Sequence, residues 1–149
     1  MERILLAVDG SEHSQRAASF AGELSGCMGA LVFVLHIVPE RVFVSTQGSL
    51  RQYAQIERFY VSQQHILEAA GRNLVEEAAA RVRQAEGKVD GEEVVLGNPA
   101  GEIVAAADRL DCDCIVMGRR GLGDVGGLLM GSVSHKVGHL TDKTLITTQ

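Results

Sequence analysis

The chain has 149 residues, of which 46% are hydrophobic and 22% are charged, and its formal net charge is −5 at pH 7. This size and balance are typical of one ordinary globular domain, so we expect a single domain over residues 1–149. The acidic balance excludes wholesale binding to nucleic acid, which requires a basic face. The opening "MERILLAVDG" lacks the long apolar region of a secretory signal, and no apolar run approaches the length of a membrane span, so we expect a cytoplasmic location without membrane contact.

The first half of the chain alternates apolar runs with helical patterns. Residues 4–8 and 31–38 are continuous apolar runs, which are typical of strands that are buried on both faces. Between them, Ser11 is placed to cap a helix. After an irregular stretch at about residues 39–51, apolar residues recur at spacings of three and four over roughly residues 52–86, which predicts one long amphipathic helix. Its predicted inward stripe comprises Ile56, Phe59, Gln63, Ile66, Ala70, Leu74, Ala78, Val82 and Ala85.

The second half continues the alternation. Asn98 and Pro99 have the residue types of an N-cap and a first helical position, and they open a helix that we expect to run through Leu110. A last helix should start near Ser132 and end near Leu140. The remaining predicted strands are the apolar runs at residues 94–96, 114–117 and 144–147.

The resulting order of elements is β-α-β-α-β-α-β-α-β. Strands that alternate with helices imply right-handed crossovers. The sequence therefore predicts an α/β fold with an open, doubly wound, five-stranded parallel sheet and helices on both faces, which is a Rossmann-like arrangement. Such sheets bind ligands at the carboxyl ends of their strands.

The most glycine-rich stretch is "GRRGLGDVGGLLMGSVSHK", from Gly118 to Lys136, which carries six of the chain's 17 glycines. It follows a predicted strand and leads into a predicted helix, so a phosphate cradle is the first hypothesis. Two known phosphate motifs fail here. A Walker loop needs a lysine where Ser132 stands, and a dinucleotide fingerprint needs three spaced glycines where "VDGSEHS" has one.

What remains is Gly118-x2-Gly121-x9-Gly131-Ser132. We expect Gly118 and Gly121 to allow turns with positive φ and the close approach of a ligand. Gly131 and Ser132 should begin a helix, whose free N–H groups and dipole attract an anion.

Other side chains of the stretch suit the same chemistry. Arg119 and Arg120 can offset phosphate charge, and the hydroxyls of Ser132 and Ser134 can add hydrogen bonds. A flexible surface loop with Ser132 as a simple N-cap explains the same residues, so the residues alone leave both interpretations open.

The pattern Gly-x2-Gly-x9-Gly-Ser resembles the ATP-binding motif of the universal stress protein family, and the resemblance covers nearly the whole chain. "RILLAVDGSEHS" is similar to the family's first strand and turn, "VLHIV" to its second strand, "GNPAGEIV" to its third turn and "DCDCIVMGRRG" to its fourth strand. The resemblance to the ATP-binding branch implies a fold of the adenine nucleotide alpha hydrolase-like type and an ATP ligand with Mg²⁺ or Mn²⁺. It also implies a homodimer through the last strand, here residues 144–148.

The resemblance implies a role for each matching residue. Asp9, at the end of the first strand, would contact the ribose or a metal ion on the phosphates. The adenine would be bordered by Ala7, Val8 and Ile37, the ribose side would be held by Met117 and Gly118, and the phosphates would be wrapped by Gly121, Gly131, Ser132, Val133 and Ser134, with Arg119 and Arg120 beside them.

Some residues depart from the family's pattern. Arg119 stands where a small polar residue is common, and Gly126 and Gly127 replace longer polar residues. Asp124 puts a negative charge in the arc, which would repel phosphate unless a divalent ion lies between them or the side chain points to solvent. The final strand, "KTLITTQ", is more polar than is usual in the family.

The cysteines and histidines have plain structural interpretations. Cys27, Cys112 and Cys114 are too few for a disulfide framework, and strand alternation would place Cys112 and Cys114 on one face as buried thiols. His36 is expected to be a satisfied core histidine. A shared helix face at spacing i, i+4 holds two further histidines, His135 and His139, which could clamp zinc, but "HKVGH" lacks the glutamate of a zinc protease and a solvated face is the favoured interpretation.

We therefore predict an ATP-binding, nucleotide-dependent switch of the stress response, in which occupancy orders residues 119–131, together with the loop at residues 39–51, and changes a surface offered to an unknown protein partner. No Ser-His-Asp or Cys-His set can be assembled, so hydrolysis should be slow at most. Two other interpretations stay open. One is a slow ATPase or autophosphorylating enzyme with Ser132 or Ser134 as the acceptor, and the other is a dimeric interaction module that has lost nucleotide binding.

Overall fold

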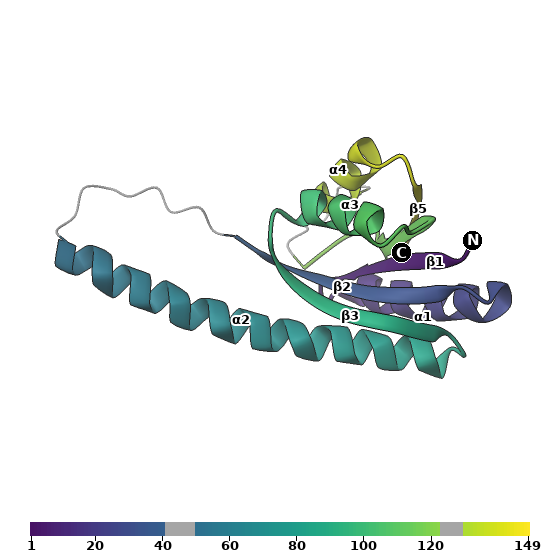
Figure 1. The fold of residues 1–149 in the computed structure, drawn as a ribbon, viewed down its shortest axis with the longest axis horizontal. Helices are drawn as coiled ribbons and strands as arrows, with labels where there is room; N and C mark the ends of the chain where they lie inside the picture. The colour runs from purple at the N-terminus through teal and green to yellow at the C-terminus, as the bar shows by residue number, and fades with distance from the viewer. Residues whose placement is uncertain (41–49, 123–129) are drawn as a thin grey trace.

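A computed structural model describes residues 1–40, 50–122 and 130–149, and of residues 50–60 and 62 the backbone alone. The described residues form one five-stranded, all-parallel sheet in the order β3-β2-β1-β4-β5 (Figure 1). This confirms the predicted open, doubly wound α/β fold. The elements in chain order are β1 (Arg3–Val8), α1 (Glu12–Met28), β2 (Leu31–Pro39), α2 (Leu50–Gln84), β3 (Lys88–Gly97), α3 (Pro99–Arg109), β4 (Cys114–Gly118), α4 (Ser132–Leu140) and β5 (Thr144–Thr148).

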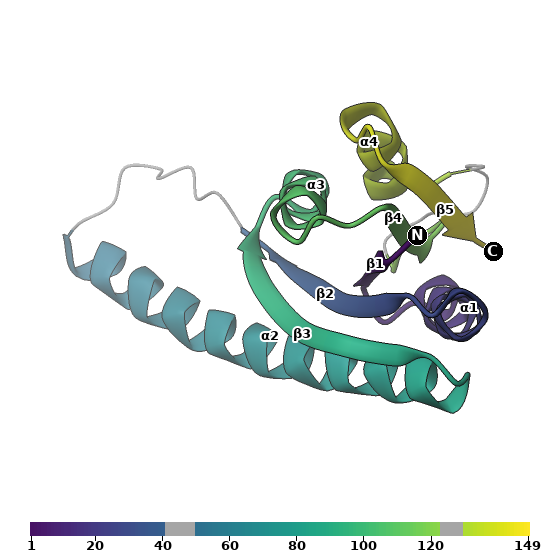
Figure 2. The ribbon, with the colours of Figure 1, turned by 45° about the vertical axis from the view of Figure 1, so that its right-hand side comes forward.

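The sheet is covered on both faces, with α1 and α2 on one side and α3 and α4 on the other (Figure 2). The side chains of β1, the central strand, point alternately to the two faces of the sheet. Ile4 and Leu6 of β1 pack with apolar residues of α1 and α2, whereas Leu5 and Ala7 pack with those of α3 and α4. All four side chains are buried, so β1 needs a continuous apolar sequence rather than an alternating one.

The helix starts follow the predicted caps. Ser11 is the N-cap of α1, and its hydroxyl accepts a hydrogen bond from the Ser14 N–H group at 3.2 Å. Asn98 caps α3 in the same way through the Gly101 N–H group, also at 3.2 Å, and Pro99 is the first helical residue. Each cap satisfies an N–H group that the first turn of a helix leaves free.

Strand β3 is longer than the predicted run at residues 94–96, because it begins at Lys88. It lies at an edge of the sheet, and its first residues, "KVDGEE", are mostly polar. The register with β2 shifts by one residue after Val32, which leaves Asp90 outside the pairing. A polar, bulged edge strand gives no apolar run over its first half, so sequence patterning identified only its apolar end at residues 94–96.

Helix α2 contradicts part of its predicted stripe. Val82 and Ala78 pack onto the sheet, but Ile66 is 66% exposed and Ala70 is also exposed. The helix spans 35 residues, or about 52 Å, and its N-terminal half extends past the sheet that it covers (Figure 1). The prediction that Ile66 and Ala70 face inward is therefore wrong, because no residue that the structure describes covers their side chains. The side chains of Ile56 and Phe59 lie outside the described residues.

The cysteine pair also differs from its prediction. Cys112 and Cys114 are buried, as expected, but they pack in the clusters on opposite faces of the sheet rather than on one. The reason is that β4 begins at Cys114, so strand alternation does not extend back to Cys112. Burial raises the pKa of both thiols to about 11.

These pKa values predict selective alkylation. In the native protein at about pH 8, iodoacetamide should modify the exposed Cys27 and leave Cys112 and Cys114 largely unreacted, because the thiolate is the nucleophile. A pKa of about 11 leaves roughly one thiol in a thousand ionised at that pH. Peptide mass spectrometry before and after unfolding in urea measures the difference. Equal rates at all three positions in the native protein would contradict the burial.

Candidate functional site

A cavity of about 370 Å³ opens at the carboxyl ends of β1, β2 and β4, beside the first turn of α4. The strand order reverses at β1, because the chain passes from β1 to β2 on one side and reaches β4 on the other. This is the topological switch point at which doubly wound sheets bind ligands. The lining includes every predicted site residue except Arg119, namely Ala7, Val8, Asp9, Ile37, Met117, Gly118, Arg120, Gly121, Gly131, Ser132, Val133 and Ser134.

Asp9 holds the turn that follows β1. Its Oδ1 atom accepts a hydrogen bond from the Ser11 N–H group at 3.0 Å, and its Oδ2 atom accepts one from the Leu122 N–H group at 3.2 Å. The half-buried carboxylate therefore joins the start of α1 to the glycine arc. Each oxygen keeps a second lone-pair site, so the side chain can still face a ligand in the cavity.

Gly118 and Gly121 are needed for close contacts rather than for unusual backbone angles. Among the described residues, the glycines with positive φ are Gly10 and Gly29, so the expectation of positive φ at Gly118 and Gly121 is wrong. A Cβ atom on Gly118 would lie 2.9 Å from backbone and Cβ atoms of His13, and one on Gly121 would lie 2.6 Å from Asp9 Oδ2. The two glycines let the end of β4 pass directly against the first turn of α1.

Arg119 lies outside the cavity lining, but its backbone connects three elements. Its N–H group donates to the Thr148 carbonyl at 2.8 Å, at the end of β5. Its carbonyl oxygen accepts from the Gly131 N–H group and from the Ser134 hydroxyl, each at 2.8 Å. Arg119 thus fixes the start of α4 and the end of β5 relative to β4.

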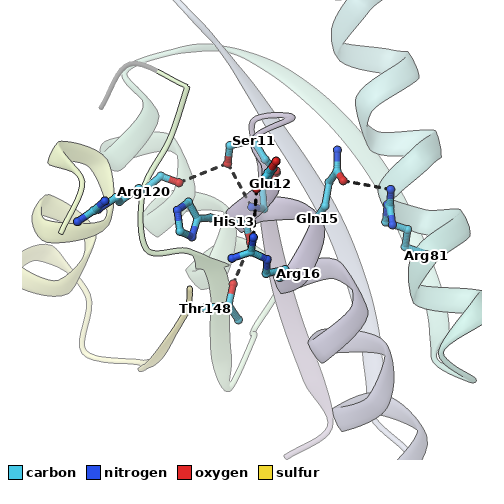
Figure 3. A network of polar contacts seen from close by, with 9 residues as sticks. Ser11, Glu12, His13, Gln15, Arg16, Arg81, Arg120 and Thr148 are labelled. Carbon is cyan, nitrogen blue, oxygen red and sulfur yellow. Dashed lines mark hydrogen bonds and ion pairs between the residues drawn. The ribbon is translucent and has the colours of Figure 1, made fainter. Parts of the chain in front are cut away.

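The neighbouring Arg120 supplies positive charge to the cavity wall. Its carbonyl accepts a hydrogen bond from the Ser11 hydroxyl at 3.3 Å, which ties its backbone to α1 (Figure 3). Its Nε atom is buried and has no hydrogen-bond partner among the residues that the structure describes. An unpartnered buried N–H group of a cation beside a cavity is suited to receive an anionic ligand.

His13 lies at the centre of the same network. Its carbonyl accepts from the Thr148 hydroxyl at 2.9 Å, so α1 and the end of β5 are joined directly (Figure 3). The next turn of α1 is tied to α2, because Arg81 donates to Gln15 Oε1 at 3.1 Å. Helix α1, whose residue Ser14 lines the cavity, is therefore tied both to the last strand of the sheet and to α2.

The two serines of the motif are in different environments. Ser134 is 2% exposed, and its hydroxyl lies within hydrogen-bonding distance of the carbonyls of Arg119 and Gly131. Ser132 is exposed at the first turn of α4 and lines the cavity. The Ser132 hydroxyl is therefore the one positioned to meet a ligand from solvent, and the Ser134 hydroxyl serves mainly to fix the helix.

Several lining residues were not identified from the sequence. His36 was expected to be a satisfied core histidine. Its Nδ1 atom does lie at hydrogen-bonding distance from the Val8 carbonyl, 2.7 Å away, but the side chain is half-buried and lines the cavity, so its place in the core was predicted wrongly. Its position at the end of β2, one residue before Ile37, was the available signal. The others are Ser14, Leu35, Pro39, Pro99, Ile103 and Leu122.

Other predictions concern residues at or beyond the edge of the described chain. Asp124, Gly126 and Gly127 lie outside it, as does most of the stretch at residues 39–51.

No group of three or more potential metal ligands of the His, Cys, Asp or Glu type occurs among the residues that the structure describes. Within the same residues, no helix combines the length and the apolar character that a membrane span requires.

The fold and the cavity define a doubly wound α/β domain with a ligand-sized cavity at its switch point. Over residues 1–148 the sequence matches the universal stress protein family. It is 37% identical over 142 residues to the "Universal stress protein in QAH/OAS sulfhydrylase 3'region" of Thermus aquaticus, a match that covers 90% of this chain and 88% of that protein. The chain therefore belongs to the universal stress protein family.

Solved structures share the fold over nearly the full chain. The hypothetical protein MJ0577 has a TM-score of 0.80 at 24% identity, over 99% of this chain and 94% of its own. A universal stress protein in complex with cAMP has a TM-score of 0.65 at 21% identity, over 99% and 96% of the two chains. The universal stress protein of Archaeoglobus fulgidus in complex with dAMP has a TM-score of 0.68 at 24% identity, over 100% and 98%.

The close contacts at Gly118 predict that adding a single methyl group there lowers the stability of the fold. Gly118→Ala should lower the free energy of unfolding by about 1–3 kcal/mol, because the new Cβ atom meets backbone atoms that cannot rotate away. Gly138→Ala in α4 is the matched control. Its Cβ atom would meet only Leu145 Cδ2, at 3.4 Å, and alanine favours the helix by about 0.5–1 kcal/mol. Urea denaturation of both variants measures the effect, and equal stabilities would contradict the contact.

Proposed function

We propose that the cavity binds ATP and that the protein acts as a nucleotide-dependent switch. The observation that carries the proposal is that residues from six separate helices and strands form one cavity of about 370 Å³, within the usual size range of small-ligand pockets. Its lining combines apolar residues of the strands with polar residues of the glycine arc and the start of α4, which suits a ligand that carries both an aromatic base and phosphates.

The apolar part of the wall suits the adenine. Ala7, Ile37 and Met117 come from three neighbouring strands, and each is largely buried beneath the cavity. The strands are rigid and packed on both faces, so this part of the pocket is formed before a ligand arrives. Asp9, next to Val8, is placed for a ribose hydroxyl, since a carboxylate accepts hydrogen bonds from hydroxyl groups.

The polar part suits the phosphates. Helix α4 begins at Ser132 with Gly131 as its N-cap, and no side chain occupies the cap hydrogen bond. The N–H groups of its first turn and the positive end of its dipole therefore face the cavity region without competition from a capping side chain. The Arg120 guanidinium adds a full positive charge to the same wall.

The ligands of two structural relatives support this class of ligand. One universal stress protein was solved with cAMP and another with dAMP, and both molecules are adenine nucleotides. The distinction between ATP and a monophosphate depends on the phosphate side, where this chain has the Gly-x2-Gly-x9-Gly-Ser spacing and Arg120.

A divalent ion would accompany the nucleotide. Asp9 is the one carboxylate that the described lining contains, so Mg²⁺ or Mn²⁺ would take Asp9 as a protein ligand and its other ligands from phosphate oxygens and water. This donor set fits the usual binding of Mg²⁺, which keeps several waters. The ion would supply charge neutralisation for the phosphates, and Asp9 would orient it.

Calorimetric titration tests the ligand. The wild-type protein should bind ATP with Mg²⁺, and Gly131→Val should weaken binding by about tenfold or more. The φ of −71° at Gly131 is open to any residue, so valine should leave the backbone intact and place its side chain at the cavity wall. Gly138→Ala, on the same helix but outside the lining, should bind as the wild type does.

A second variant separates the phosphate side from the base. Arg120→Gln should weaken ATP binding and leave adenosine binding nearly unchanged, because only the phosphates carry charge. Absence of any binding heat with the wild-type protein, together with no nucleotide released on denaturation, would remove the proposal and favour an interaction module.

The switch would work through the contacts of Arg119. A ligand that orders the first turn of α4 also acts on Ser134 and Gly131, which bond to the Arg119 carbonyl, and the Arg119 N–H group bonds to the end of β5. Residues 144–148 form an edge strand with one unpaired side, which is the surface we propose for a homodimer. Hydrolysis would be slow or incidental, because Asp9, which would hold the metal ion, is the one carboxylate that the described lining offers as a general base.

Hydrogen exchange tests this coupling. ATP with Mg²⁺ should slow amide exchange at residues 131–134 and also at residues 144–149, with the second effect weakened in Ser134→Ala. Protection confined to the cavity lining would contradict the switch without affecting the binding proposal.

A further inference from the structure

Two histidines on the exposed face of α4 form a pair that the nucleotide site does not use. The Nε2 atoms of His135 and His139 lie 3.3 Å apart, and their ring centroids lie 4.6 Å apart with the rings inclined by 69°. Both side chains are exposed, and neither lines the cavity. The pair therefore brings two ring nitrogen atoms together on the exposed face of α4.

We propose that His135 and His139 chelate a divalent transition-metal ion of the group Zn²⁺, Ni²⁺ and Cu²⁺. Imidazole nitrogen binds Zn²⁺ at about 2.0–2.1 Å, so two such ligands of a tetrahedral ion lie about 3.3–3.4 Å apart. Two adjacent ligands in square or octahedral geometry lie about 2.9–3.0 Å apart. The observed separation of 3.3 Å between the two Nε2 atoms matches the tetrahedral value. A small rotation of the imidazole rings would bring it to the value for square or octahedral geometry.

The spacing is fixed by the helix before a metal arrives. The His135 N–H group donates to the Gly131 carbonyl at 3.0 Å, and Val137 between the two histidines is fully buried against the sheet. Residues four apart lie one above the other on a helix, so little conformational freedom is lost when both rings take up the same ion. The i, i+4 spacing that the sequence analysis interpreted as a solvated face is thus also a preformed chelate.

The protonation change is small. In the metal-free protein the two Nε2 atoms lie at hydrogen-bonding distance, and the tautomers of the two rings decide which nitrogen donates. Metal binding requires both Nε2 atoms to be unprotonated, so a hydrogen on either Nε2 atom leaves to solvent. The metal ion then replaces the direct contact between the two nitrogen atoms.

The ligand set defines which ions can bind. Nitrogen ligands favour Ni²⁺, Cu²⁺ and Zn²⁺ over Mg²⁺ and Ca²⁺, which prefer oxygen. Among the described residues no third His, Cys, Asp or Glu completes the cluster, so water would fill the remaining positions. This open site is distinct from the Mg²⁺ or Mn²⁺ ion proposed beside Asp9, which lies in the cavity.

Calorimetric titration of the full chain without a histidine tag tests the proposal, with ZnCl₂ and NiCl₂ as probes. A Cys27→Ser background removes the exposed thiol, which is a competing ligand. We expect one ion per chain, and His135→Ala or His139→Ala should each weaken binding by about tenfold or more. His65→Ala, at another exposed histidine, should leave the affinity unchanged.

A variant with the same number of histidines separates chelation from simple histidine content. Lys136→His combined with His139→Ala places the two imidazoles at adjacent positions, which diverge by about 100° around the helix, and should bind as weakly as His139→Ala. Circular dichroism and the nitrogen shifts of the imidazoles, measured by NMR, report folding and Nε2 ligation directly. Wild-type affinity in the double variant His135→Ala and His139→Ala, or no binding by the wild-type chain, would overturn the proposal.

Discussion

The close contact between the end of β4 and the first turn of α1 determines much of the rest of the structure. It exists because Gly118 has no side chain, so that backbone atoms of His13 can lie where a Cβ atom would be. From this contact the chain leaves β4 in the direction that places Arg119 against Thr148 and Arg120 against Ser11. The start of α4 is then set by hydrogen bonds to the Arg119 carbonyl. The absence of a Cβ atom at Gly118 thereby allows the contacts that position Arg120 and the start of α4 at the cavity.

Physical chemistry explains why the cavity residues could be inferred from the sequence. Asp9, Met117 and Gly118 come at the ends of buried strands, and the ends of parallel strands meet at one edge of the sheet. The Gly131-Ser132 start of α4 follows from the apolar spacing beyond it. These features are local, so a single sequence contains them. The prediction that the ligand is a nucleotide depends on the resemblance to a family and not on the spacing of residues alone.

The features that were missed depend on what lies opposite a residue in space. Ile66 has the spacing of an inward-facing residue, but the sequence does not show where the sheet ends. The polar first half of β3 is a strand only because β2 offers it a partner. His36 and Ile103 line the cavity because of the way β2 and α3 cross it. Cys112 and Cys114 separate onto two faces because the strand begins between them. Each of these features depends on tertiary packing, which the residue pattern of a single sequence does not contain.

The long helix α2 connects the cavity wall to a point well beyond the sheet. His36 lines the cavity, and its ring lies against Gly71 of α2 so closely that a Cβ atom on Gly71 would be 2.8 Å from His36 Cδ2. From Gly71 the helix continues for about 30 Å to its first residue at Leu50, beyond the sheet (Figure 1). Over that length, a tilt of about 5° at Gly71 would move the far end of the helix by about 3 Å. A small rearrangement at the cavity wall would thereby become a larger displacement at the first residue of α2.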